Sequence, residues 1–147
     1  MVILAPLLLS LIASSHATLG KSADAVEHLR KAFHATRVKT LDRKTFTVQV
    51  VTKEGALIRE YLNSGGVVFA VTWAGDVQPD LAPILGERLE EFSLRLAQGP
   101  RRRGRFAGQT VKAKDFVVET FGHMRAMRGR AYIPSLFPAG MTANEID

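Results

Sequence analysis

The sequence predicts an α+β fold in which an antiparallel sheet of about five strands packs against one main helix, with a short N-terminal helix at its margin. Three observations lead to this prediction. Runs rich in β-branched and aromatic residues follow one another between residues 45 and 73, joined by short glycine-containing connections, which is typical of a meander. The segment 81–97 carries apolar residues at helical spacing. Two further strand-like runs near the C-terminus predict a hairpin.

Composition sets outer limits on the kind of protein. The chain has 147 residues, of which 46% are hydrophobic and 23% are charged, values that are ordinary for a globular protein. Lys and Arg number 20 against 14 Asp and Glu, so the net charge is +6, which favours anionic partners. The absence of cysteine excludes a disulfide framework, a thiolate nucleophile and cysteine metal ligands.

The first residues predict export. Residues 1–17 contain no Asp, Glu, Lys or Arg, and their apolar centre, Val2–Ala13, is shorter than the ~20 residues that a membrane-spanning helix needs. The end of this segment, Ser15-His16-Ala17, has the small residues that signal peptidase requires. An N-terminal core helix is the alternative, but Pro6 would interrupt it. We therefore expect a signal peptide at 1–17 and, at 18–147, a single exported α+β domain in the periplasm or outside the cell, with no integral membrane span after leader removal.

The first half of the mature chain predicts a helix followed by a three-stranded meander. Apolar residues at spacings of three and four indicate a short amphipathic helix at 21–35. Strands are expected at 45–52, 56–62 and 67–73, and they should be antiparallel because the connections are too short for a parallel crossover. In the third of these strands, alternation predicts that the larger residues share the face that meets the core: Val67, Phe69, Val71 and Trp73.

The second half predicts the main helix and the C-terminal hairpin. The helix at 81–97 follows Asp80, a suitable N-cap, and precedes an exposed basic loop at 98–110. Strands are expected at 115–121 and 124–133, joined by Gly122-His123 as a two-residue turn. Within the last strand, alternation places Arg128, Arg130 and Tyr132 on one face, together with Met124 and Ala126.

The candidate ligand-binding residues are Arg130 and Tyr132 of that face, together with three residues from elsewhere in the chain: Arg59, Tyr61 and His123. Arginines and a tyrosine in a row can bind a carboxylate, a phosphate or a sugar acid. The simpler alternative is that these residues face solvent, or that an arginine pairs with Glu60 or Glu119 across the sheet. Gly129, inside the same strand, indicates a bulge or a close backbone approach.

The basic loop supplies a second set of candidates: Arg101, Arg102, Arg103 and Arg105. Between Glu91 and Asp115 there are seven basic residues and no acid, a pattern that can bind polyanions by electrostatics with little specificity. An ordinary solvated loop is the alternative, because Phe106 is the one aromatic residue that accompanies these arginines.

Motifs for catalysis are missing from the sequence. It contains no G-x-S-x-G or S-x-x-K arrangement, no H-E-x-x-H spacing and no phosphate-binding loop. We therefore expect no catalytic residue, metal or cofactor. A small hydrolase acting on an envelope polymer stays as an alternative, with His123, Glu119 and Glu60 as its candidate residues.

A series of short blocks in a fixed order carries a resemblance to a known family: Leu57-Ile58-Arg59-Glu60-Tyr61, Gly66 to Gly75, Pro79-Asp80-Leu81 with Leu85-Gly86, Gly122-His123-Met124, and Gly129 to Pro134. Together they resemble an uncharacterised family of small exported proteobacterial proteins, a domain of unknown function. The resemblance implies an exported single-domain protein and carries no activity, cofactor or catalytic residue with it. We expect a non-catalytic binding or accessory protein whose partner is unknown, with an anionic envelope component or another exported protein as the candidates.

Overall fold

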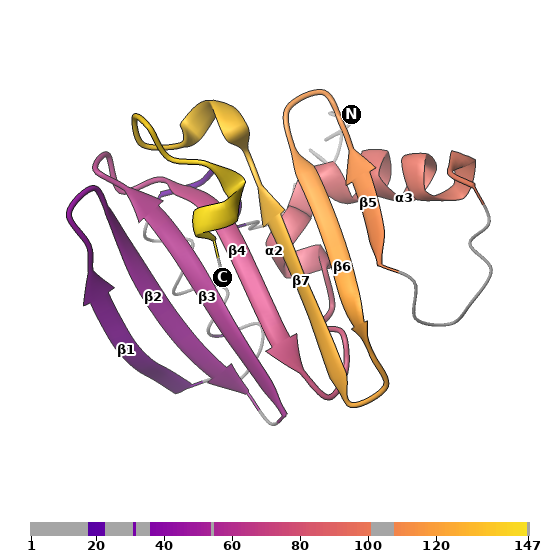
Figure 1. Cartoon of the computed structure of the whole chain (residues 1–147), viewed down its shortest axis with the longest axis horizontal. Helices are drawn as coiled ribbons and strands as arrows, with labels where there is room; N and C mark the ends of the chain where they lie inside the picture. Colours follow the sequence, from indigo (N-terminus) through magenta and orange to yellow (C-terminus); the bar gives the residue numbers. More distant parts are fainter. Residues whose placement is uncertain (1–17, 23–30, 32–35, 54, 101–107, 147) are drawn as a thin grey trace, which may run out of the picture.

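A computed structural model of the chain describes residues 18–22, 31, 36–53, 55–100 and 108–146. Within these ranges, seven strands form one antiparallel sheet with the spatial order β1-β2-β3-β4-β7-β6-β5 (Figure 1). The strands are β1 (Thr36–Asp42), β2 (Phe46–Lys53), β3 (Ala56–Asn63), β4 (Val68–Gly75), β5 (Gln109–Lys112), β6 (Val117–His123) and β7 (Ala126–Tyr132). The predicted α+β class and antiparallel pairing are confirmed, whereas the expected number of about five strands was too low.

The two strands that sequence patterns missed are the edges of the sheet. β1 pairs with β2 alone and β5 pairs with β6 alone. Edge strands tolerate polar and charged residues because one side of the backbone has no partner strand, so the polar sequences TRVKTLD and QTVK carry little alternation. The helix expected at 21–35 and the signal peptide expected at 1–17 lie almost entirely outside the described residues.

The main helix is broken, contrary to the prediction of a continuous helix at 81–97. A short helix α2 (Ala82–Leu85) passes through a 3-10 turn at Gly86–Arg88 into α3 (Leu89–Gln98). Gly86 has a φ of +53°, a conformation that glycine adopts readily and that stops α2. The apolar stripe is nevertheless kept, and Ile84, Leu85 and Phe92 are buried against the sheet.

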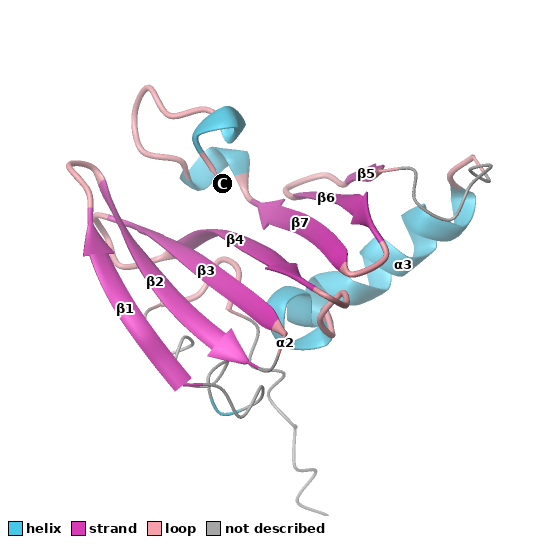
Figure 2. Cartoon of the chain, turned by 60° about the horizontal axis from the view of Figure 1, so that its bottom comes forward, coloured by secondary structure: helices cyan, strands magenta, loops and turns pink. Residues whose placement is uncertain are grey.

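Both faces of the sheet are covered, by different parts of the chain. The helices lie on one side, where they pack on Ile58, Val71 and Trp73 (Figure 2). Residues 134–146, which we call the C-terminal strap, lie on the other side and pack on a second apolar cluster (Figures 1 and 2). The central strand β4 therefore has six consecutive buried residues, Val68 to Trp73.

A bulge in β4 changes which side chains share a face. Tyr61 pairs with Ala70 and Leu62 pairs with Val68, which leaves Phe69 without a partner in β3. Val68 consequently faces the helices, while Phe69 packs on the strap side beside Ala70. The prediction that Phe69 shares a face with Val71 and Trp73 was wrong, because strict alternation does not allow for the extra residue.

Gly129 in β7 lies directly opposite Trp73 in β4. A Cβ atom at Gly129 would stand 2.2 Å from Cζ2 of the indole, so this position has no room for a side chain. The glycine therefore marks a close approach, but the group that approaches is the indole side chain of Trp73, whereas the sequence indicated a bulge or a close backbone approach.

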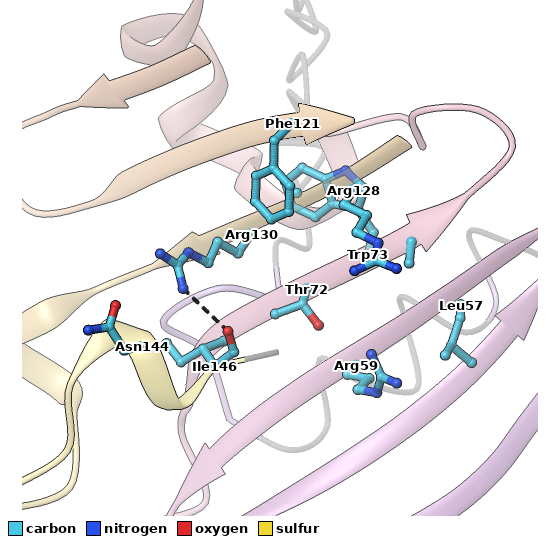
Figure 3. Close-up of a pocket in the computed structure, with 11 residues that line it drawn as sticks. Leu57, Arg59, Thr72, Trp73, Phe121, Arg128, Arg130, Asn144 and Ile146 are labelled. Carbon is cyan, nitrogen blue, oxygen red and sulfur yellow. Dashed lines mark hydrogen bonds between the residues drawn. The ribbon is translucent and has the colours of Figure 1, made fainter. Parts of the chain in front are cut away.

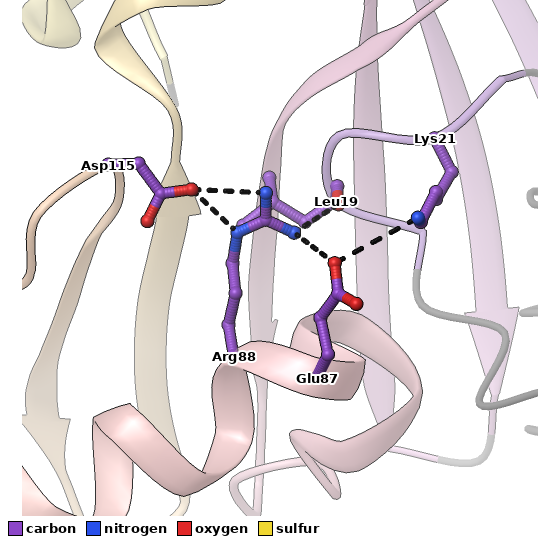
Figure 4. A network of polar contacts seen from close by, with 5 residues as sticks. All are labelled: Leu19, Lys21, Glu87, Arg88 and Asp115. Carbon is purple, nitrogen blue, oxygen red and sulfur yellow. Dashed lines mark hydrogen bonds and ion pairs between the residues drawn. The ribbon is translucent and has the colours of Figure 1, made fainter.

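Residues 18–22 are tied to the helices through Arg88 (Figure 4). Its guanidinium donates to the carbonyl oxygen of Leu19 at 3.2 Å and to Asp115 at 3.2 Å. Glu87 adds longer ion pairs to Arg88 at 4.0 Å and to Lys21 at 3.9 Å. Residues 18–22 are thereby fixed against both the helices and the β5–β6 connection.

Candidate functional site

A trough runs along β4 on the strap side of the sheet (Figure 3). Antiparallel register places Arg59, Thr72, Arg130 and Glu119 side by side in one row across β3, β4, β7 and β6. The next row is Leu57, Ala74, Arg128 and Phe121. The central strand contributes the small residues and its neighbours the large ones, so a hollow of about 480 Å³ forms over β4.

The C-terminal strap forms one end of the trough. Asn144 and Ile146 line that end, and Ile146 is buried at 3% exposure. The strap is held in shape by a capping box, in which the backbone N–H of Thr142 donates to the Glu145 carboxylate at 2.6 Å. The trough is therefore bounded by folded chain at this end.

Arg130 connects the strap to the sheet. Its Nε donates to Glu119 of β6, and its Nη1 donates to the carbonyl oxygens of Ala143 and Ile146, the latter at 3.3 Å (Figure 3). Its guanidinium also lies 5.7 Å from the centre of the Tyr132 ring, within the range of a cation–π contact. The charge of Arg130 is thus balanced by Glu119, and most of its donors are used by the protein itself.

Arg128 differs from Arg130 in having no partner among the residues that the structure describes. The described residues provide neither an ion pair nor a hydrogen bond to its guanidinium, and the side chain is exposed at the trough. Phe121 stands directly opposite it in β6 and is 44% exposed, a high value for a large apolar side chain. An unpaired cation therefore lies beside an exposed aromatic ring.

The two tyrosines among the predicted ligand contacts are buried beside the trough, and neither lines it. Tyr61 and Tyr132 belong to the apolar cluster under the strap, where Phe137 lies 5.6 Å from the Tyr132 ring. Burial raises the pKa of the Tyr132 phenol, the charge of Glu119 raises that pKa further, and Arg130 opposes both. These positions are consistent with a structural role for both rings.

His123 lies at the exposed end of β6, and the turn expected there is displaced by two residues. His123 pairs with Ala126, so the connection is Met124-Arg125, with Arg125 at a φ of 66°. Gly122 belongs to β6, where its φ is 115° and a Cβ would lie 2.1 Å from the carbonyl oxygen of Ala126. The prediction of a Gly122-His123 turn was wrong, because Gly122 lies within β6 and its lack of a side chain lets the strand approach the carbonyl oxygen of Ala126 in β7.

The three residues considered for a hydrolase do not come together. Glu60 is fully buried on the helix side of the sheet, whereas Glu119 points to the strap side and pairs with Arg130. His123 lies four residues along β6 from Glu119, about 13 Å away at the rise of a strand. In the described part of the chain there is also no group of three or more His, Cys, Asp or Glu that could hold a metal ion.

Most residues of the trough were not predicted as site residues from the sequence, and Arg128 and Phe121 are the two among them that matter most for binding. Alternation already placed Arg128 on the same face as Arg130, which was the available signal. Phe121 could be assigned only once the register of β6 against β7 was known. Of the other predicted residues, Arg59 and Arg130 line the trough, while Arg101, Arg102, Arg103 and Arg105 lie outside the described residues.

Comparison with known proteins identifies a family and a structure of similar fold. No curated protein matches the chain. Among solved structures, the chain is similar to a cysteine-rich secretory protein from Staphylococcus aureus subsp. aureus Mu50, with a TM-score of 0.46 and 9% sequence identity. The similarity covers 80% of this chain and 45% of that one, so the chain spans less than half the length of its neighbour.

A family model covers almost the whole described domain. It matches residues 15–146, and its description is "Protein of unknown function (DUF2844)". The resemblance to an uncharacterised family, noted from short sequence blocks, is confirmed by this match. The chain belongs to the DUF2844 family of proteins of unknown function.

Proposed function

We propose that this chain is an exported, non-catalytic binding protein that holds an anionic ligand in the trough over β4. The observation that carries the proposal is Arg128, a guanidinium at the surface of a hollow that has no ion pair or hydrogen bond to any residue that the structure describes. Arg59 and Arg130 line the same hollow, and Arg59 adds positive potential to it. Glu119, which faces them, is already paired with Arg130.

The size of the trough and the guanidinium groups that line it favour the binding of a small anionic ligand. Its volume of about 480 Å³ lies within the range of about 300–1,000 Å³ that is common for ligand pockets. A guanidinium can donate two parallel hydrogen bonds to a carboxylate or phosphate, and hydrogen bonds to charged groups contribute about 1.5–3 kcal/mol each. The net charge of +6 would also speed the approach of an anion.

Export is part of the proposal, and it is supported by the apolar leader pattern of residues 1–17. The helices of the described ranges are all too short or too polar to cross a membrane. An anionic envelope component or another exported protein that carries an acidic group would be a suitable partner in either the periplasm or the medium.

The proposal is tested by measuring thermal unfolding with increasing concentrations of acetate, glucuronate and inorganic phosphate at constant ionic strength. At least one of these anions should raise the melting temperature in a saturable way, because a ligand that binds only the folded state stabilises it. Arg128→Gln should abolish the effect. Arg125→Asn removes the same charge from the neighbouring turn, outside the trough, and should preserve it. No saturable effect, or equal loss in both variants, would refute the proposal.

A second candidate function, polyanion binding, is favoured by one observation next to the basic loop. Arg95 and Lys112 line a smaller hollow of about 290 Å³ between the end of α3 and β5, where the loop begins and ends. Heparin chromatography of a variant in which Arg101, Arg102, Arg103 and Arg105 are all replaced by serine tests this function. Retention should fall to a lower salt concentration, and unchanged salt-sensitive retention would exclude the loop as the binding element.

A further inference from the structure

The pairing of charges in the trough indicates how many acidic groups its ligand carries. Among the described arginines that line it, Arg128 is the one for which the structure shows no interaction, because Arg130 is balanced by Glu119 and Arg59 is not free. A single guanidinium pairs best with one carboxylate in fork geometry, in which two parallel N–H groups donate to the two carboxylate oxygens. The charge distribution therefore favours a ligand with a single acidic group placed at Arg128.

The surroundings of Arg128 are apolar on both sides. In the row that contains it, Phe121 is its neighbour in β6, Ala74 is its neighbour in β4, and Leu57 follows in β3. Adjacent strands are about 4.8 Å apart, so Leu57 lies about 10 Å from Arg128 across the floor formed by Ala74. This distance leaves room for an aromatic ring or a short alkyl chain next to the bound acid.

Phe121 gives the strongest sign of such an apolar body. It is 44% exposed, in the third pair of the β6–β7 ladder from the turn and beyond the end of β5, and it faces the trough (Figure 3). Exposed aromatic rings beside a polar anchoring group are typical of ligand pockets, in which most of the lining is apolar and a few polar groups fix the orientation.

The strap limits the length of the ligand. Asn144 and Ile146 line one end of the trough, and Arg130 holds that part of the strap to the sheet through two carbonyl oxygens. A long polymer would have to displace this end in order to pass along β4. The trough therefore suits a compact molecule or the end of a longer one.

We infer that the trough binds a monocarboxylate with an apolar body, with the carboxylate on Arg128 and the body over Ala74 between Phe121 and Leu57. This inference rests on the proposed function and adds the chemical class of the ligand. Phe121 then determines specificity, because it contacts the body and leaves the acid untouched.

Isothermal titration calorimetry with four probes tests the inference: phenylacetate, octanoate, acetate and inorganic phosphate. Phenylacetate or octanoate should bind about tenfold or more tightly than acetate, because burying the apolar body adds a hydrophobic contribution. Phosphate should bind more weakly than phenylacetate and octanoate. Phe121→Thr, which introduces a β-branched residue that suits a strand, should remove most of the preference for phenylacetate and octanoate over acetate while leaving acetate binding unchanged.

Variants at the acid-binding position complete the test. Arg128→Gln should weaken phenylacetate binding by about tenfold or more, and Arg125→Asn should leave it unchanged. Arg128→Lys keeps the charge without the fork and should give an intermediate affinity, so it replaces Arg128→Gln if that variant does not fold.

The outcomes separate the inference from the proposed function. Equal affinity for acetate, phenylacetate and octanoate would overturn the apolar body while leaving anion binding intact. Tightest binding of phosphate would overturn the carboxylate class, again without affecting anion binding. If none of the four probes bound in an Arg128-dependent way, both the inference and the proposed function would fail.

Discussion

Replacing Gly129 with alanine should destabilise the protein by about 3 kcal/mol, because the new methyl group would collide with Trp73. The Cβ would stand 2.2, 2.4 and 2.7 Å from Cζ2, Cε2 and Nε1 of the indole. Unbonded carbon atoms normally stay about 3.5–4.0 Å apart, so the ring would have to retreat by about 1.3 Å. Trp73 is 2% exposed and sits in the cluster that packs under the helices, which leaves little space for this movement.

The expected magnitude follows from overpacking. Extra atoms in a well-packed core cost about 1–3 kcal/mol, and the collision here involves rigid ring atoms on a strand backbone, which points to the upper end. For a domain of this size, about 3 kcal/mol corresponds to a fall in melting temperature of about 10 °C. Urea unfolding followed by circular dichroism would measure the loss of free energy directly.

Gly99→Ala is the matched control for this substitution. Gly99 has a φ of −69°, and a Cβ there would lie 3.5 Å from the nearest carbonyl oxygen, an ordinary contact. We expect its effect to stay within about 0.5 kcal/mol. In a Trp73→Leu background, Gly129→Ala should cost less than in the native chain by about 1 kcal/mol or more, because the obstructing ring is gone. Equal effects of the two glycine substitutions, or strict additivity with Trp73→Leu, would refute the reasoning.

Three further predictions concern the strap, the tyrosine beneath it and the leader. Glu119→Gln should lower the free energy of unfolding by about 1–2 kcal/mol, because Arg130 loses its counter-charge. The same substitution should make the C-terminal strap more sensitive to limited proteolysis. An unchanged digestion pattern would argue against a role of the Arg130–Glu119 pair in holding the strap. The pKa of Tyr132 is higher in the folded protein than in the unfolded chain. The contribution of its neutral phenol to the free energy of unfolding is therefore complete below the ordinary tyrosine pKa of about 10, and it is lost as the pH rises through the pKa of the folded state. Tyr132→Phe should therefore flatten the alkaline loss of stability in unfolding titrations, and an identical pH profile would contradict this assignment. Cleavage after Ala17 should give a mature chain that begins at Thr18 when the gene is expressed in a Gram-negative host, which intact mass spectrometry of the periplasmic fraction would show; a full-length mass there would contradict export by this leader.

Much of the sheet could be predicted because alternation and short connections are local signals. β2, β3, β4 and β6 were anticipated by runs that contain β-branched and aromatic residues, and β7 was anticipated as the second strand of the C-terminal hairpin. The features that escaped prediction depend on contacts between distant residues. The bulge at Phe69 is visible only in the pairing of β3 with β4, and the position of the β6–β7 turn depends on the contact of Gly122 with Ala126.

Part of the candidate site could also be predicted from local alternation. Alternation put Arg130 and Arg128 on one face of β7, and Arg59 came from β3, which is separated from β7 by β4. The burial of Tyr61 and Tyr132 could not be foreseen, because it requires the C-terminal strap to fold back over the sheet. That segment has no periodic pattern, and its placement depends on bonds such as those from Arg130 to the strap carbonyl oxygens.

The most direct test of the trough as a ligand site is an NMR titration of the arginine side-chain Nε–Hε signals with phenylacetate. The Arg128 signal should shift in a saturable way, with a midpoint equal to the dissociation constant from calorimetry, while the Arg125 signal at the neighbouring turn stays in place. An Arg128 signal that does not move, or that drifts linearly together with Arg125, would contradict ligand binding in the trough.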